Sequence, residues 1–186
     1  MKKNLANKNS IFTALIALVV ILILVRITPV SVEPVVKLII SKNRVAVSDI
    51  YQIREIEVTR EVMVDKLNLI VNNRFRHPKL GNVATFSDDF FVDVHHQITV
   101  NEADTYRFLM GSDDGFSLNI DGKVICEHLG DRPYTVQPCL IHLDKGKHTV
   151  NISYFQGFGN SGFTVQYARG DGKTYWFGES SPNITF

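Results

Sequence analysis

The feature that most constrains this chain is an alternation of apolar and polar side chains that becomes regular near Phe86. In the segment 91–100, Val92 and Val94 share one face of an extended strand with the apolar residues further along. The dipeptide Asp121-Gly122 supplies the positive φ of a tight hairpin turn between two such segments. Turn signals recur at intervals of about 8–12 residues, so the sequence predicts an all-β, antiparallel sandwich or barrel.

The N-terminus has a different pattern, a continuous apolar run from Ile11 to Val25 that only Thr13 interrupts. Counted on to Val30, the run reaches about twenty residues, enough for a helix to cross a hydrocarbon core of about 30 Å. Arg26 can extend its charged end to the interface. We therefore expect one N-terminal transmembrane α-helix over residues 10–30.

A cleaved signal peptide is the alternative interpretation of this run. Cleavage needs a small-x-small site, and the residues that follow Val25 contain none, so an uncleaved signal-anchor is favoured. We expect a single-pass membrane protein with a cytoplasmic tail over residues 1–9, a juxtamembrane stalk over 31–44, and a periplasmic or extracellular domain over 45–186. Within that domain, residues 45–73 fit either a strand or a helix.

Composition excludes several function classes. The chain has 20 Lys and Arg against 19 Asp and Glu, so no net charge attracts nucleic acid. Cys126 and Cys139 lack the C-x-x-C spacing of a zinc or redox centre, and they lie in consecutive strand-like segments. We expect them to be close in space, either as a disulfide or as two buried thiols. No nucleophile motif, phosphate loop or metal-binding His pair is present, so no enzyme is predicted.

The segment with the clearest chemical potential is Ser112-Asp113-Asp114-Gly115, which lies between two alternating strands. Adjacent carboxylates repel each other, and a hard cation bound between them removes that repulsion. Ca²⁺ accepts several oxygen ligands in a loose geometry that suits loops. Ordinary turn chemistry is the competing interpretation, because Asp and Gly are both common in β-turns.

Several spaced motifs in this region resemble one family, the protective-antigen-type lectin-like domain abbreviated PA14. The resemblance covers at least Phe86 to Tyr167. The residues that carry it are Tyr106-x-Phe108, Ser112-Asp113-Asp114-Gly115, Leu118-x-Ile120-Asp121-Gly122, Leu143-x-x-Gly146-x-His148 and Tyr154-Phe155-x-Gly157 leading to Gly162.

The resemblance implies a two-sheet β-sandwich in which Asp113 and Asp114 coordinate Ca²⁺ through a cis peptide bond. It also implies an Asn ligand from a second loop, for which Asn160 is the matching residue. A sugar would add hydroxyl oxygens to the calcium shell and lay an apolar face on an aromatic ring. Phe158 and Tyr134 are the candidate rings, although both could instead pack locally as loop residues.

Two functions follow as expectations. The first is a membrane-anchored, calcium-dependent carbohydrate-binding protein of the lectin or adhesin type, which faces a glycan or an exopolysaccharide. The second is a structural or accessory subunit of a cell-envelope protein complex, in which the sandwich makes protein contacts. A calcium site open to solvent distinguishes them, because only the lectin requires one.

Overall fold

The computed structural model describes residues 8–27, 33–80 and 86–186. The chain divides into two compact units, and the boundary along the chain falls between Glu33 and Pro34. The first unit contains one helix, α1 (Lys8–Ile27), and its large apolar side chains from Phe12 to Ile23 are 45–65% exposed. A helix is therefore present where the sequence predicts one. Among the described residues, however, no helix is long and apolar enough to span a membrane.

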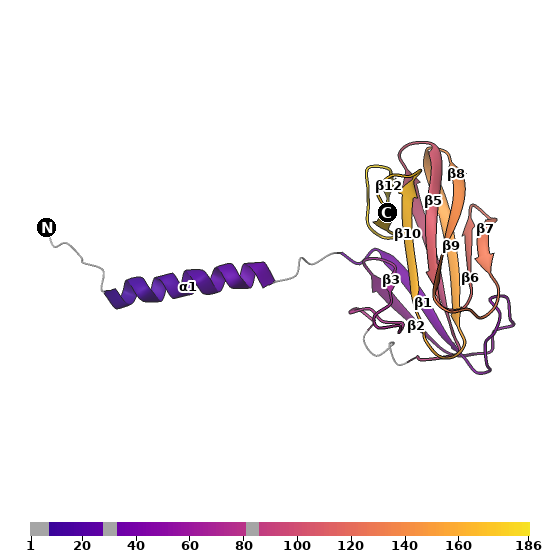
Figure 1. Ribbon diagram of the computed structural model, residues 1–186, viewed down its shortest axis with the longest axis horizontal. Helices are drawn as coiled ribbons and strands as arrows, with labels where there is room; N and C mark the ends of the chain where they lie inside the picture. The colour runs from indigo at the N-terminus through magenta and orange to yellow at the C-terminus, as the bar shows by residue number, and fades with distance from the viewer. Residues whose placement is uncertain (1–7, 28–32, 81–85) are drawn as a thin grey trace. The chain divides into compact units, whose positions relative to one another are not determined.

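The second unit consists of two antiparallel β-sheets (Figure 1). The first sheet contains, in spatial order, β2 (Ile56–Val64), β1 (Val36–Asn43), β4 (Phe90–Val100), β9 (Gly146–Gln156), β6 (Phe116–Ile120) and β7 (Lys123–His128), with β12 (Ile184–Thr185) paired to β4. The second contains β11 (Tyr175–Trp176), β10 (Phe163–Arg169), β5 (Asp104–Ser112) and β8 (Thr135–Leu143), with β3 (Asn68–Leu69) paired to β10. The predicted two-sheet sandwich is thus confirmed.

The core forms because each long strand turns its apolar face towards the other sheet. On β4, Val92 and Val94 are fully buried and Ile98 is 1% exposed, as the alternation predicts. On the facing sheet, Tyr106 and Phe108 of β5 are also fully buried. One continuous apolar cluster therefore fills the space between the sheets.

Strand β1 corrects the predicted stalk, because Val36–Asn43 belong to the sandwich and not to a juxtamembrane segment. The strand lies between β2 and β4, and Leu38 pairs with Val62 on one side and Val94 on the other. Its apolar clump is too short to cross a membrane but fits a central strand, whose neighbours supply the partners for its backbone. The ambiguous segment 45–73 resolves mainly into a loop and the edge strand β2.

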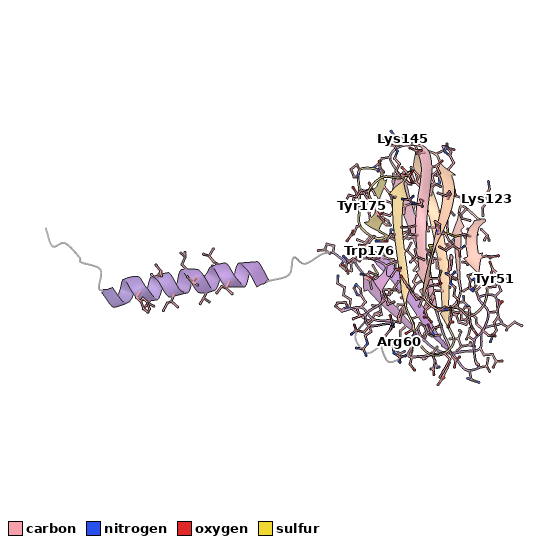
Figure 2. All side chains as sticks on the ribbon, in the orientation of Figure 1. Tyr51, Arg60, Lys123, Lys145, Tyr175 and Trp176 are labelled. Atoms are coloured by element: carbon pink, nitrogen blue, oxygen red, sulfur yellow. A yellow bond between two sulfur atoms is a disulfide. The ribbon has the colours of Figure 1, made fainter. Side chains whose placement is uncertain are left out.

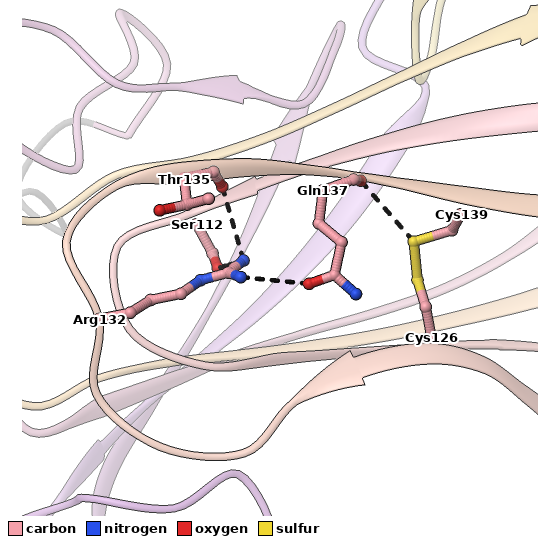
Figure 3. The surroundings of a disulfide bond; sticks show 6 residues. All are labelled: Ser112, Cys126, Arg132, Thr135, Gln137 and Cys139. Carbon is pink, nitrogen blue, oxygen red and sulfur yellow. Dashed lines mark hydrogen bonds between the residues drawn. A yellow bond between two sulfur atoms is a disulfide. The ribbon is translucent and has the colours of Figure 1, made fainter.

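A disulfide joins the two sheets (Figure 3). Cys126 lies on β7 of the first sheet and Cys139 on β8 of the second, and their Cα atoms are 5.9 Å apart. The predicted proximity of the two cysteines is confirmed, and of the two alternatives the structure has the disulfide. The bridge holds together two strands that do not hydrogen-bond to each other.

Candidate functional site

The candidate site begins at the tip where β5 ends at Ser112 and the chain crosses to β6 in the opposite sheet. Asp114 makes the crossing with a φ of 64°, a left-handed conformation that Asp tolerates better than most residues. The described residues contain no cis peptide bond, so the cis bond expected between Asp113 and Asp114 is wrong. A left-handed Asp114 reverses the chain at this point instead.

Backbone N–H groups from two neighbouring loops hold both carboxylates. Asp113 Oδ2 accepts a hydrogen bond of 3.1 Å from the N–H of Tyr134. Asp114 Oδ2 accepts one of 2.7 Å from Gly157, and its Oδ1 accepts one of 3.3 Å from Arg132. The loop before β8 and the loop after β9 therefore fix the positions of both side chains.

The electrostatic environment of the pair disfavours two negative charges. Asp113 and Asp114 are 7% and 5% exposed, and within the described part of the chain no Lys, Arg or His forms an ion pair with either. Burial raises the pKa of Asp113, although the Tyr134 N–H opposes this change. Burial also raises the pKa of Asp114 to about 6, and the nearby Asp131 carboxylate adds to the effect.

A cavity of about 450 Å³ opens above this pair. Its lining residues are Asp113, Asp114, Asp131, Arg132, Pro133, Phe158 and Asn160. Four residues singled out from the sequence thus meet in one place, from loops more than forty residues apart in the chain. Phe158 is 89% exposed, so its ring stands almost free at this cavity.

The sequence interpretation missed three residues of this cavity, Asp131, Arg132 and Pro133, and Asp131 is the one that adds a carboxylate. A Cβ added to Gly157 would lie 3.5 Å from Asp114 Oδ2 and 3.6 Å from Asp131 Oδ1, so the two carboxylates face the same glycine. In the sequence, Gly130-Asp131 resembles any surface turn. Only the folding of the loop before β8 against the tip reveals its position.

Tyr134 does not line the cavity. Its hydroxyl lies 2.6 Å from Thr164 Oγ1, on the second sheet, and its contribution to the site is the backbone N–H that reaches Asp113. The structure therefore separates Tyr134 from the other candidate sugar-binding residues. Phe158 is the aromatic ring that borders the cavity.

The side chain of Arg132 forms hydrogen bonds to residues at the tip and on β8 (Figure 3). Its Nη2 donates to Ser112 Oγ at 2.7 Å and its Nη1 donates to Gln137 Oε1 at 3.2 Å. The Ser112 hydroxyl in turn donates to the carbonyl oxygen of Asp114 at 2.7 Å. The Arg132 guanidinium therefore helps to hold the backbone of the tip in place through the Ser112 hydroxyl.

The oxygen atoms at the cavity fit a hard cation better than a transition metal. In the described ranges, no cluster of three or more His, Cys, Asp or Glu side chains has an arrangement that could hold a metal ion. Two buried carboxylates without a cationic partner and the Asn160 amide are nevertheless the ligand types that Ca²⁺ takes, completed by carbonyl or non-protein oxygens. The backbone carbonyl oxygen of Asn160 accepts a 2.7 Å hydrogen bond from Gln156 Nε2, which fixes this loop.

Comparisons with known proteins show which solved structures share this fold. The sequence matches no protein-family model and none of the curated proteins. Similar solved structures include a PA14 sugar-binding domain from an RTX adhesin (TM-score 0.59, 18% identity, 77% of this chain and 95% of that one). An anti-sigma factor domain-containing protein has a TM-score of 0.61 and 14% identity over 78% of this chain, which spans only 46% of that protein. The Epithelial Adhesin 9 A domain of Candida glabrata, in complex with Galb1-3GlcNAc, has a TM-score of 0.55 and 11% identity (81% and 89% covered).

The β-sandwich of this chain therefore shares its architecture with these solved domains. Its fold is that of the PA14 domains, as the sequence resemblance predicts.

Proposed function

We propose that the chain is a carbohydrate-binding protein of the lectin or adhesin type that uses a calcium-dependent site at Asp113 and Asp114. One observation carries the proposal. Two buried carboxylates without a cationic partner open into a cavity that an almost fully exposed aromatic ring, Phe158, borders. Neither feature is what stability alone would favour, because a buried charge without a cationic partner is unfavourable and a Phe that is 89% exposed buries little apolar area.

Asp113, Asp114 and Asn160 would hold the cation. Bound there, Ca²⁺ supplies coordination positions that hydroxyl oxygens of a sugar can fill. Phe158 presents a flat apolar surface on which the C–H face of a pyranose ring can lie. The names of two structural neighbours, a sugar-binding domain and an adhesin solved with a disaccharide, are consistent with this use of the fold.

A glycan array probed with the full chain, with and without millimolar calcium, tests the proposal. Millimolar calcium is appropriate because extracellular calcium modules bind with a Kd of about 10⁻⁴–10⁻³ M. We expect calcium-dependent binding that Phe158→Ala weakens at least tenfold with no loss of thermal stability. Ile53→Ala is the matched control, because Ile53 is 86% exposed but lies outside the cavity. Calcium-independent binding, or equal binding by both variants, would contradict the proposed site.

The same proposal places the domain outside the cytoplasm, attached to a membrane by its N-terminal segment. The disulfide Cys126–Cys139 supports the location, because such bonds persist in oxidising compartments. The apolar run from Ile11 to Val25 supports the attachment. Fractionation of cells followed by an alkaline wash measures the attachment, and recovery of the chain in the washed soluble fraction would contradict it.

A structural or accessory role in an envelope complex is the second candidate. Leu140 and Val136 on the edge strand β8 are 66% and 50% exposed, and Val124 on β7 is 54% exposed. Apolar side chains on a sheet edge are typical of protein contacts. Replacement of Leu140 by Lys would abolish an assembly that uses this edge, as measured by cross-linking in cells, and would leave calcium and sugar binding unchanged.

A further inference from the structure

Two smaller hollows lie near the cavity of about 450 Å³ that Asp113, Asp114 and Phe158 line, which is called the calcium-site cavity below. The nearer has a volume of about 170 Å³ and is lined by Arg74, Ser87, Asp88, Phe158 and Gly159. The farther has about 260 Å³ and is lined by Arg74, Phe75, Arg76, Phe86, Ser87 and Ser161. Phe158 lines the first two cavities and Arg74 the last two, so the three are neighbours on the surface of the sandwich, and this series of cavities is called the path below.

The charges along this path change sign. Three aspartates line the calcium-site cavity, whereas two arginines, Arg74 and Arg76, line the far hollow. In the described part of the chain, neither arginine forms an ion pair. Asp88, the acidic residue of the middle hollow, is already paired with Lys42, whose Nζ lies 3.1 Å from its Oδ1.

The arginine-bearing turn is fixed to the loop that carries Phe158. Asn72 and Asn73 have φ values of 53° and 55°, the left-handed pair of a tight turn, and the turn presents Arg74. Arg74 Nη1 donates to the carbonyl oxygen of Gly159 at 2.6 Å. The N–H of Ser161 donates to the carbonyl oxygen of Asn73 at 3.1 Å. The basic hollow and the aromatic ring therefore keep a constant separation.

We propose that Arg74 and Arg76 form a subsite for an acidic group of the glycan, a carboxylate or a sulfate, on a sugar unit beyond the one at the calcium site. This inference rests on the proposed function and names its ligand class, an acidic oligosaccharide. A guanidinium presents a planar fork of N–H donors that matches carboxylate and sulfate oxygens. Three aspartates would repel such a ligand, so bound calcium is needed both to hold the first sugar and to neutralise the cavity that the acidic chain must cross.

The test is an array on which each glycan appears in a neutral, a uronic acid and a sulfated form, probed with the full chain in millimolar calcium. We expect acidic forms to bind at least tenfold more tightly than their neutral counterparts, which corresponds to about 1.4 kcal/mol. Arg74→Gln and Arg76→Gln should each reduce this preference and leave neutral binding unchanged. Arg60→Gln is the control, because Arg60 lies on β2 (Figure 2), lines none of the three cavities, and gives the same charge change. The preference should also fall with added salt.

The outcomes separate the two proposals. Equal binding of neutral and acidic forms, or an acidic preference that both arginine variants retain, overturns the subsite and leaves the calcium-dependent lectin intact. Absence of binding to every glycan overturns both. If Arg74→Gln disturbs the Phe158 loop, neutral binding falls as well. Arg76→Gln then decides, because among the described residues Arg74 is hydrogen-bonded to that loop and Arg76 is hydrogen-bonded to Leu69 instead. A preference for one acidic form over the other identifies which anion the subsite takes.

Discussion

The carboxylate of Asp114 accepts a hydrogen bond of 2.7 Å from the backbone N–H of Gly157, a residue 43 positions further along the chain. Gly157 can carry no side chain, because a Cβ would lie 2.5 Å from the carbonyl oxygen of Val47. The buried carboxylate, the loop with Phe158 and the segment around Val47 are therefore packed at one point. The geometry of the candidate site depends on all three loops together.

Asp113→Asn should separate metal binding from folding. Of the two carboxylate oxygens, Oδ2 accepts the Tyr134 N–H, and an Asn side chain can keep this bond while it removes a buried charge. Without calcium, we expect a stability at neutral pH equal to the wild type or higher by up to about 1 kcal/mol. At 5 mM calcium the wild type should gain about 1 kcal/mol if its Kd is near 10⁻³ M, and the variant nothing. Thermal unfolding measures both quantities.

Asp171→Asn is the control for this experiment, because the Asp171 side chain is fully exposed at the surface. It should respond to calcium like the wild type. A calcium response in Asp113→Asn equal to that of the control would show that the cation binds elsewhere.

Calcium affinity should depend on pH around the titration of Asp114. Burial raises the pKa of Asp114 to about 6, and calcium competes with this proton. The Kd should therefore be about tenfold weaker at pH 5 than at pH 7 and level above that. The stability of the calcium-free protein should change with pH in the opposite direction to its calcium affinity. Between pH 4 and 6 the folded state binds more protons than the unfolded state, so stability falls as pH rises through this window. Calorimetry from pH 5 to 8 measures the affinity, and a flat profile would exclude Asp114 as a ligand.

The sequence predicts those parts of the molecule that depend on local patterns. Alternation predicts the buried face of β4, and the resemblance brings Asp113 and Phe158 to one site. The sequence does not predict strand β1, because a short segment with an apolar clump has the same pattern whether or not neighbouring strands pair with it. Asp131 and Arg74 are also missed, because their positions depend on how loops pack, and no local pattern in the sequence indicates which loops meet.

Removal of the disulfide should cost stability but not disturb the candidate site. The bridge closes a loop with a sequence separation of 13, for which the chain-entropy model gives about 3 kcal/mol. The double variant Cys126→Ala/Cys139→Ala should lose about this amount in denaturant unfolding, and a reductant should lower the wild type to a similar level. Calcium and glycan affinity should stay within twofold of the wild type. No effect of the reductant on unfolding would mean that the bond does not form in the protein.

His148 lies near the start of β9, where its side chain links two turns of the chain. Its Nδ1 lies 2.6 Å from Asp121 Oδ2 in the turn between β6 and β7, and its Nε2 lies 2.8 Å from the carbonyl oxygen of Asp144 in the turn before β9. Both ring nitrogens face acceptors, so the geometry suits the doubly protonated ring. Burial alone would lower the pKa of His148, but the Asp121 carboxylate and the Asp144 carbonyl raise it above the usual value.

The stability of the domain should therefore fall as pH rises above about 6.5 and through the higher folded pKa of His148, because the folded state binds this proton more tightly than the unfolded chain. The loss should be on the order of 1 kcal/mol, as for a partly exposed ion pair. His148→Gln, which keeps a donor without a titratable charge, should flatten the stability profile between pH 6 and 9. His142→Gln is the matched control, because His142 lies 3.8 Å from Asp144 Oδ1 with a largely exposed ring, and it should retain the wild-type slope. If His148→Gln keeps that slope as well, the pH dependence has another origin.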